Sequence, residues 1–152
     1  MKLQLKAVLP EECVAFLQSK LAAFDQSKLE YFRLYDRTRQ TATVGVWGRC
    51  TYPSRTQKLG YRIRCCVSIM AGEFPYPVKY AIGTRRVSGN QWEWEWRKDK
   101  FWTKAEAFVW VAGHEAFHWL RHSRQISGAN YETRANRFGF AWLDEWRMAI
   151  AW

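Results

Sequence analysis

Two histidines and the glutamate between them are the residues of this 152-residue chain best suited to chemistry. The stretch 111–118 reads Val-Ala-Gly-His-Glu-Ala-Phe-His and so contains the pattern His-Glu-x-x-His. On an α-helix, residues four apart lie on one face, which would place His114 and His118 about 6 Å apart along the axis. Two imidazoles in this arrangement can bind one Zn²⁺, and Glu115 can act as general base on a zinc-bound water.

A catalytic zinc needs a third protein ligand and one open position. His122 continues the series, but on a straight helix it lies about 12 Å from His114 along the axis, whereas two nitrogens on one zinc are about 3–4 Å apart. We therefore expect His122 at the rim of the site and predict Glu132 as the third ligand. A turn at Gly128 would bring the helix of Glu132 back against the first helix. The alternative role for Glu132 is to stabilise the dipole of its own helix.

Four residues close to the predicted ligands are candidates for supporting roles. Asn136 is one turn further along the same helix face, where it could accept the outer N–H of a ligating histidine and fix its tautomer. A peptidase also needs a donor to the oxyanion of its transition state. Tyr131, Arg134 and His122 are the candidates for that donor.

The helices that would position these residues have recognisable ends. Thr103 and Glu106 form a capping box, so the motif helix begins there and ends before Ser127-Gly128. We expect its buried stripe to comprise Ala105, Phe108, Val109, Ala112, Ala116, Trp119 and Leu120. Asn130 is the expected cap of a second helix over Tyr131–Ala149, which would run antiparallel to the first.

The first hundred residues predict one more helix and several strands. A weak strand or extended lead-in over residues 1–9 precedes a helix that opens at Pro10-Glu11-Glu12 and runs to about Asp25. The apolar set Leu29, Phe32 and Leu34 either continues this helix or follows a break. Strands are predicted over Thr41–Trp47, Tyr61–Met70, Val78–Val87 and Gln91–Arg97, with a hairpin turn at 88–90. The expected fold is α+β, a single domain over 1–152 with an antiparallel or mixed sheet of about three to five strands.

Three tryptophans alternate with glutamates in the last predicted strand. Trp92, Trp94 and Trp96 would share one face, with Glu93 and Glu95 on the other. The simplest interpretation is that the tryptophans bury one face of the sheet. The alternative is that they are exposed and act as stacking platforms for single-stranded nucleic acid.

The residues from 114 to 122, read with those from 132 to 139, resemble the ImmA/IrrE-type minimal gluzincins. That family has His-Glu-x-x-His with a further histidine one turn later, then a helix with Glu-x-x-Ala-Asn-x-Phe-Ala; here the second motif reads Glu-Thr-Arg-Ala-Asn-Arg-Phe-Gly. The resemblance covers about residues 103–145. It implies a zincin-like fold and a zinc endopeptidase with ligands His114, His118 and Glu132 and catalytic Glu115. Gly139 departs mildly from the family's alanine, and a more distant similarity is to SprT-like proteases.

The charge and composition of the chain indicate which partners it could bind and where in the cell it is expected. The net charge is +10, and the excess lies in residues 49–104, which carry 12 basic and 4 acidic side chains. This basic region suits DNA or an acidic protein partner. The four cysteines form no Cys-x-x-Cys pair, and we expect them to be reduced, mostly packed as small apolar groups. No signal peptide or membrane span is expected, so the predicted location is cytoplasmic.

The sequence thus predicts a zinc metalloprotease that hydrolyses a protein or peptide substrate. The substrate would pair with a sheet edge by β-augmentation, and Val78–Val87 is the predicted edge. The main alternative is a basic nucleic-acid-associated protein whose zinc site is structural or vestigial. A third hypothesis is a non-enzymatic interaction module, although burying Glu115 without a metal would be costly.

Overall fold

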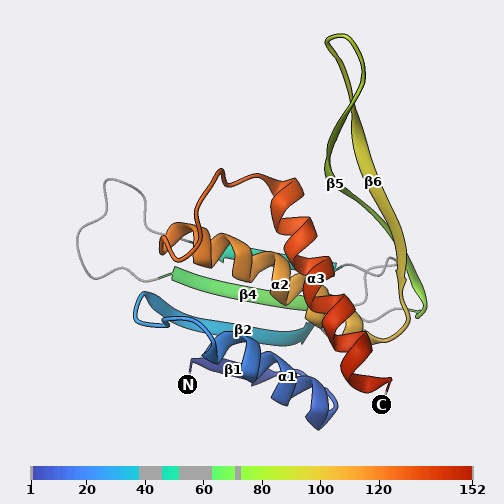
Figure 1. Cartoon of the computed structure of the whole chain (residues 1–152). Coiled ribbons are helices and arrows are strands. Elements are labelled where there is room, and N and C mark those ends of the chain that lie inside the picture. The colour runs from blue at the N-terminus through green and yellow to red at the C-terminus, as the bar shows by residue number, and fades with distance from the viewer. Residues whose placement is uncertain (1, 38–45, 52–62, 71–72, 152) are drawn as a thin grey trace.

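The computed structural model describes residues 2–37, 46–51, 63–70 and 73–151 and has an α+β fold, as predicted (Figure 1). Its elements in chain order are β1 (Leu3–Lys6), α1 (Glu11–Ala22), β2 (Leu29–Arg37), β3 (Val46–Thr51), β4 (Ile63–Met70), β5 (Tyr76–Ser88), β6 (Gln91–Phe101), α2 (Lys104–His122) and α3 (Glu132–Ile150). Most of the predicted strand Thr41–Trp47 lies outside the described residues. None of the helices described is long and apolar enough to cross a membrane.

The main sheet is mixed and has the strand order β1-β2-β4-β3. β1, β2 and β4 are parallel, and β3 closes one edge antiparallel to β4. The segment Leu29–Leu34, predicted either to continue the first helix or to follow a break, follows a break and is part of the strand β2, which the sequence did not predict. A register shift between Leu29 and Tyr31 lets Leu29, Phe32 and Leu34 all reach the buried face. This irregularity breaks the strict alternation of a strand, which is why the spacing also fitted a helix.

The last two strands do not belong to the main sheet, in contrast to the prediction of one sheet. β5 and β6 pair only with each other and form a separate two-stranded ribbon. At its base the ribbon packs into the core through Val78 and Phe101. Figure 1 shows the rest of the ribbon leaving the body as a long arm. We call residues 83–96 the arm.

The tryptophans of the arm are exposed, so the prediction that they bury a sheet face was wrong. Trp92, Trp94 and Trp96 have 64%, 58% and 50% of their surface accessible. The period-2 pattern correctly indicated a strand with its tryptophans on one face. It could not show whether another layer covers that face, and in this fold none of the described residues does so.

Helix α2 lies between the main sheet and α3 and is therefore buried on almost every side. All seven residues of its predicted stripe are buried, as expected. Thr103 caps the helix, since its side-chain oxygen accepts the N–H of Glu106 at 3.2 Å. The Glu106 carboxylate does not complete the capping box; it binds Arg147 of α3.

Arg147 holds the far ends of α2 and α3 together. Its guanidinium group also binds Asp99 and the carbonyl of Lys100. Glu106 is only 4% exposed, so removal of Arg147 would leave a buried carboxylate without its counterion. We expect Arg147→Met to lower the free energy of unfolding by about 3–5 kcal/mol, measured by urea denaturation.

Arg64→Met is the matched control for this prediction. Arg64 binds Glu30 in an ion pair whose side chains are 49% and 40% exposed. Such surface pairs contribute about 0–1 kcal/mol. Equal stability losses in the two variants would contradict the role assigned to Arg147.

The cysteines pack as predicted. All four are free thiols, and adjacent Cys65 and Cys66 face opposite sides of β4, the first fully buried and the second half-buried. Burial raises the pKa of the Cys65 thiol well above its ordinary value. Its sulfur lies 3.5 Å from that of Cys50, the facing residue of β3.

Candidate metal centre

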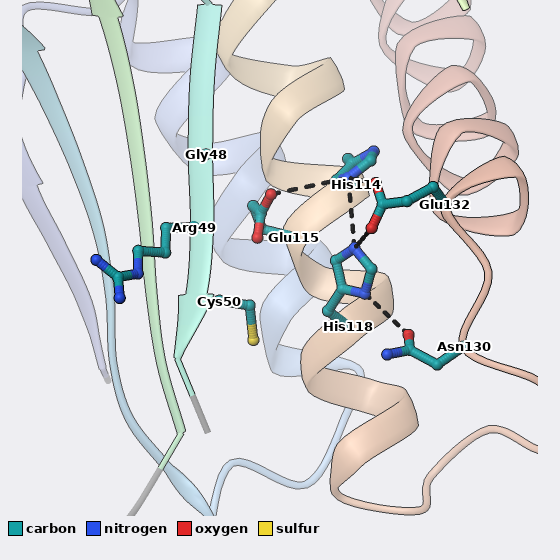
Figure 2. A pocket seen from close by; sticks show the side chains of 8 residues that line it. All are labelled: Gly48, Arg49, Cys50, His114, Glu115, His118, Asn130 and Glu132. Atoms are coloured by element: carbon teal, nitrogen blue, oxygen red, sulfur yellow. Dashed lines mark hydrogen bonds and ion pairs between the residues drawn. The ribbon is translucent and has the colours of Figure 1, made fainter. Parts of the chain in front are cut away.

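The two motif histidines point to one spot at the surface of α2, as Figure 2 shows. His114 Nε2 and His118 Nε2 are 3.4 Å apart. Both side chains are largely buried, with 12% and 11% of their surface exposed. The helical spacing therefore produces the predicted pair of converging imidazoles.

Glu132, the first residue of α3, reaches the same spot from the other side. Its carboxylate oxygens lie 3.1 Å from His114 Nε2 and 3.0 Å from His118 Nε2. The ligand atoms of His114, His118 and Glu132 all lie within 4.8 Å of one another, so the three residues could hold a metal ion. Hydrogen bonds from the two histidines hold the pKa of Glu132 far below its usual range.

The geometry of this triad fits zinc. Bonds of about 2.0–2.1 Å in a tetrahedron place two zinc-bound nitrogens about 3.4 Å apart, the separation seen between the two Nε2 atoms. Two imidazoles and a carboxylate also match the donor set of catalytic zinc sites. Each Nε2 can therefore exchange its contact with Glu132 for a shared bond to the ion.

The tautomer of His118 is set by Asn130, in the loop before α3. His118 Nδ1 lies 2.9 Å from Asn130 Oδ1, an oxygen that only accepts, so Nδ1 carries the proton. His118 Nε2 faces Glu132 and donates to it while protonated. Once Nε2 has lost its proton, its lone pair is directed at the triad. Burial alone would lower the pKa of His118, but its hydrogen bonds with Glu132 and Asn130 raise it above the ordinary value.

Asn136 does not have the role predicted for it. Its amide nitrogen donates to the carbonyl of Ala81 at 2.8 Å and so ties α3 to β5. The residue expected to cap α3, Asn130, binds His118 instead, while Tyr131 occupies the cap position without a capping side-chain hydrogen bond. Asn130 thus has the contact with a histidine that was expected of Asn136, and neither asparagine caps α3. Asn130 was missed as a partner of His118 because a cap residue and a partner for histidine are drawn from the same residue types.

The loop between the helices is shaped by Gly128 and two arginines. Gly128 has a φ of +97°, which favours glycine. Arg121 donates to the Gly128 carbonyl, and Arg134 donates to the carbonyls of Ser127 and Ala129. The predicted turn is thus confirmed, and it delivers Asn130 and Glu132 to the histidines.

His122 and Tyr131 lie outside the triad. His122 Nε2 is 3.4 Å from the Asn130 amide nitrogen, and burial lowers the pKa of His122. This rim position agrees with the helix geometry that excluded His122 as a ligand. Tyr131 is 65% exposed and lines a second pocket between α3 and the arm, together with Arg134 and Trp94.

Glu115 lies beside the triad and is almost completely buried, with 5% of its surface exposed. Its carboxylate is 3.8 Å from His114 Nε2. Burial raises the pKa of Glu115 above the ordinary value. The triad and Glu115 line one pocket, whose opposite wall is formed by Gly48, Arg49 and Cys50 of β3 (Figure 2).

Gly48 allows β3 to approach Glu115 this closely. A Cβ atom at residue 48 would lie 2.6 Å from Val111 Cγ1 and 2.7 Å from Glu115 Cγ. Any larger residue would therefore push the carboxylate away from the triad. This close approach was not visible in the sequence, because it joins segments more than sixty residues apart.

A second pair of glycines sets the distance between α2 and α3. A Cβ atom at residue 139 would lie 2.7 Å from the carbonyl oxygen of Trp110, and one at Gly113 would lie 3.0 Å from the Cα of Gly139. An alanine at residue 139 would place its methyl group against the backbone of α2. The helices of this chain touch where that methyl group would stand.

We expect Gly139→Ala to lower the free energy of unfolding by about 1–3 kcal/mol, because the helices must separate. For a chain of this size the melting temperature should fall by roughly 2–4 °C per kcal/mol. Gly83→Ala is the matched control, since a Cβ there meets only Glu95, at 4.0 Å. Calorimetry that shows equal melting temperatures for wild type and Gly139→Ala would contradict the close helix contact.

No family model, no curated protein and no solved structure matches the chain.

Proposed function

We propose that the protein is a zinc-dependent endopeptidase with a zincin-like fold. The observation that carries this proposal is the convergence of His114, His118 and Glu132 on one point beside a buried glutamate. A purely structural zinc site would use four protein ligands. The described residues supply three, together with a general base, which is the composition of a catalytic site.

When bound, zinc supplies the Lewis acidity that activates water and polarises the substrate carbonyl. Glu115 takes the proton of the attacking water on its carboxylate. It then gives this proton to the nitrogen of the leaving amine. The raised pKa of Glu115 suits the first of these steps, because a carboxylate of higher pKa is the stronger base.

The substrate is proposed to bind along β3 in an extended conformation. β3 is the edge of the main sheet and forms the wall of the pocket opposite the triad. An added strand on this edge would pass its peptide bonds in front of Glu115. The predicted strand Val78–Val87 is less suited, because β5 belongs to the separate ribbon and does not line the pocket of the triad.

The proposal is tested by metal analysis and by digestion of a protein mixture. The purified protein should contain about one zinc per chain, consistent with a single three-ligand site. It should cleave unfolded casein or a peptide library, lose this activity with a chelator and regain it with added zinc. A folded protein that takes up no zinc would refute the proposal, and one that binds zinc without cleaving any peptide would support the structural alternative.

A further inference from the structure

The arm has surface features that the proposed metal centre does not explain. The register pairs Trp92 with Arg86, Trp94 with Thr84 and Trp96 with Ala81. Directly opposed residues of an antiparallel pair lie on one face. The three exposed tryptophans therefore form a row along one face of the ribbon, which we call the tryptophan face.

The charges of the ribbon are divided between its two faces. The tryptophan face continues toward the base through Lys98 and Lys100, with Lys79 facing Lys98. By the same register this face carries no acidic residue, whereas Glu93, Glu95 and Asp99 all lie on the other face. The ribbon thus has one face whose charged residues are all cationic and whose rings are exposed.

Ion pairing follows the same division. On the other face, Arg85 binds Glu93, and Arg97 binds Asp99 and Asp144. None of the ion pairs of the described residues involves the four cations of the tryptophan face, Lys79, Arg86, Lys98 and Lys100. Instead, the Lys79 ammonium lies 4.8 Å from the centroid of the Trp96 ring. Arg86 donates from Nε to the carbonyl of Gly89 at 2.6 Å, and the Lys100 ammonium lies 5.6 Å from the centroid of the Trp102 ring. These contacts leave the positive charge of all four cations unneutralised by the acidic side chains of the described residues.

The spacing of the tryptophans along the strand suits stacking with nucleic-acid bases. Successive residues on one face of a strand are about 6.8 Å apart, twice the rise of about 3.4 Å per residue. Bases in a stacked strand are also about 3.4 Å apart. Neighbouring tryptophans are thus spaced at about twice the distance between stacked bases, and the flanking cations can contact the phosphates.

We propose that the tryptophan face of the arm binds single-stranded nucleic acid through stacking on Trp92, Trp94 and Trp96 and phosphate contacts with Lys79, Arg86, Lys98 and Lys100. The cationic charge and exposed rings are the two features that such sites combine. A duplex offers no exposed base faces to the rings. An anionic membrane is disfavoured because the tip of the arm is the polar segment Ser88-Gly89-Asn90-Gln91.

The test is fluorescence anisotropy with labelled oligo(dT) and oligo(rU) of about 16 nucleotides, the upper range of single-strand sites on small folds. Wild-type protein should bind the single strands more tightly than a duplex of equal length. Trp94→Ala should weaken binding roughly tenfold, and the triple Ala variant of the row should weaken it further. Comparison of the two oligonucleotides shows whether DNA or RNA is preferred.

Arg86 and Arg85 provide a matched pair of charge variants. They are adjacent and both exposed, but they lie on opposite faces. Arg86→Gln should weaken binding and reduce the slope of log K against log salt by about 0.7 for each phosphate that the variant no longer binds. Arg85→Gln removes the same charge and should leave both quantities close to the wild-type values.

Several results would overturn the proposal. These are equal losses in the Arg85 and Arg86 variants, unchanged binding in the triple Ala variant, or preference for the duplex. Binding to vesicles of anionic lipid without binding to either oligonucleotide would identify a membrane surface instead. A triple Trp→Tyr variant keeps stacking rings and should retain most of the affinity, so it separates stacking from loss of the hairpin fold. Glu115→Gln and metal-free protein should bind as wild type does, which makes this test independent of the proposed peptidase activity.

Discussion

Replacement of Glu115 by Gln is expected to slow peptide hydrolysis by about 10²–10⁴-fold, the usual contribution of a positioned acid–base group. Gln has nearly the same shape but cannot take a proton from water. Since Glu115 is not one of the three converging ligands, the variant should still bind zinc as tightly as wild type. The measurement is kcat/KM on a fluorogenic peptide taken from the best-cleaved casein site.

Metal content decides how this result is interpreted. A loss of both zinc and activity would mean that the substitution disturbs the triad, and Glu115→Asp would then be the second variant, because it keeps the carboxylate. Full activity in Glu115→Gln would exclude Glu115 as the base. Since Gly48 packs against Glu115, Gly48→Ala should mimic this variant, with zinc retained and hydrolysis impaired.

Substitution of a metal ligand should have a different effect from Glu115→Gln. The affinity for zinc should fall, and activity should fall because zinc is lost. Substitution of residues that merely support a metal ligand lowers affinity by about 10–100-fold. We therefore expect His118→Ala and Glu132→Ala to weaken zinc binding by about 100-fold or more. Asn130→Ala, which removes only the partner of His118 Nδ1, should fall in the range of about 10–100-fold. Competition with a chromogenic chelator measures all three.

His122→Ala is the matched control for the ligand set. It removes the only other histidine of the chain, one helical turn beyond His118, but His122 does not belong to the triad. Its zinc affinity should stay within a few-fold of wild type. A loss as large as that of Glu132→Ala would mean that His122 also takes part in metal binding and that the set of three ligands is incomplete.

The local parts of the site could be predicted because they depend on helix geometry alone. The four-residue spacing of His114 and His118 and the cap at Thr103 act within one element. The same regularity excluded His122, since a straight helix carries it too far from His114. Glu132 could be reached from the sequence because the glycine turn at Gly128 leaves a short loop and a helix few orientations.

Features that depend on contacts between two distant segments could not be predicted from the sequence. The sequence offers both Asn130 and Asn136 near the start of α3, and the hydrogen bonds of the folded chain decided that Asn130 binds His118 while Asn136 binds Ala81. Likewise, Gly139 is a small residue in the sequence, and only the packed helices show that a methyl group would strike Trp110.

The row of tryptophans shows that the sequence predicts which residues share a face but not whether that face is buried. By itself the sequence determined a period-2 strand with Trp92, Trp94 and Trp96 on one face, and a helix with two histidines on another. It did not determine what lies against either face. Tertiary structure buried the histidine helix between a sheet and α3 and left the tryptophans exposed on the arm. The reason is physical: periodicity is a property of one element, whereas burial depends on which other element packs against it.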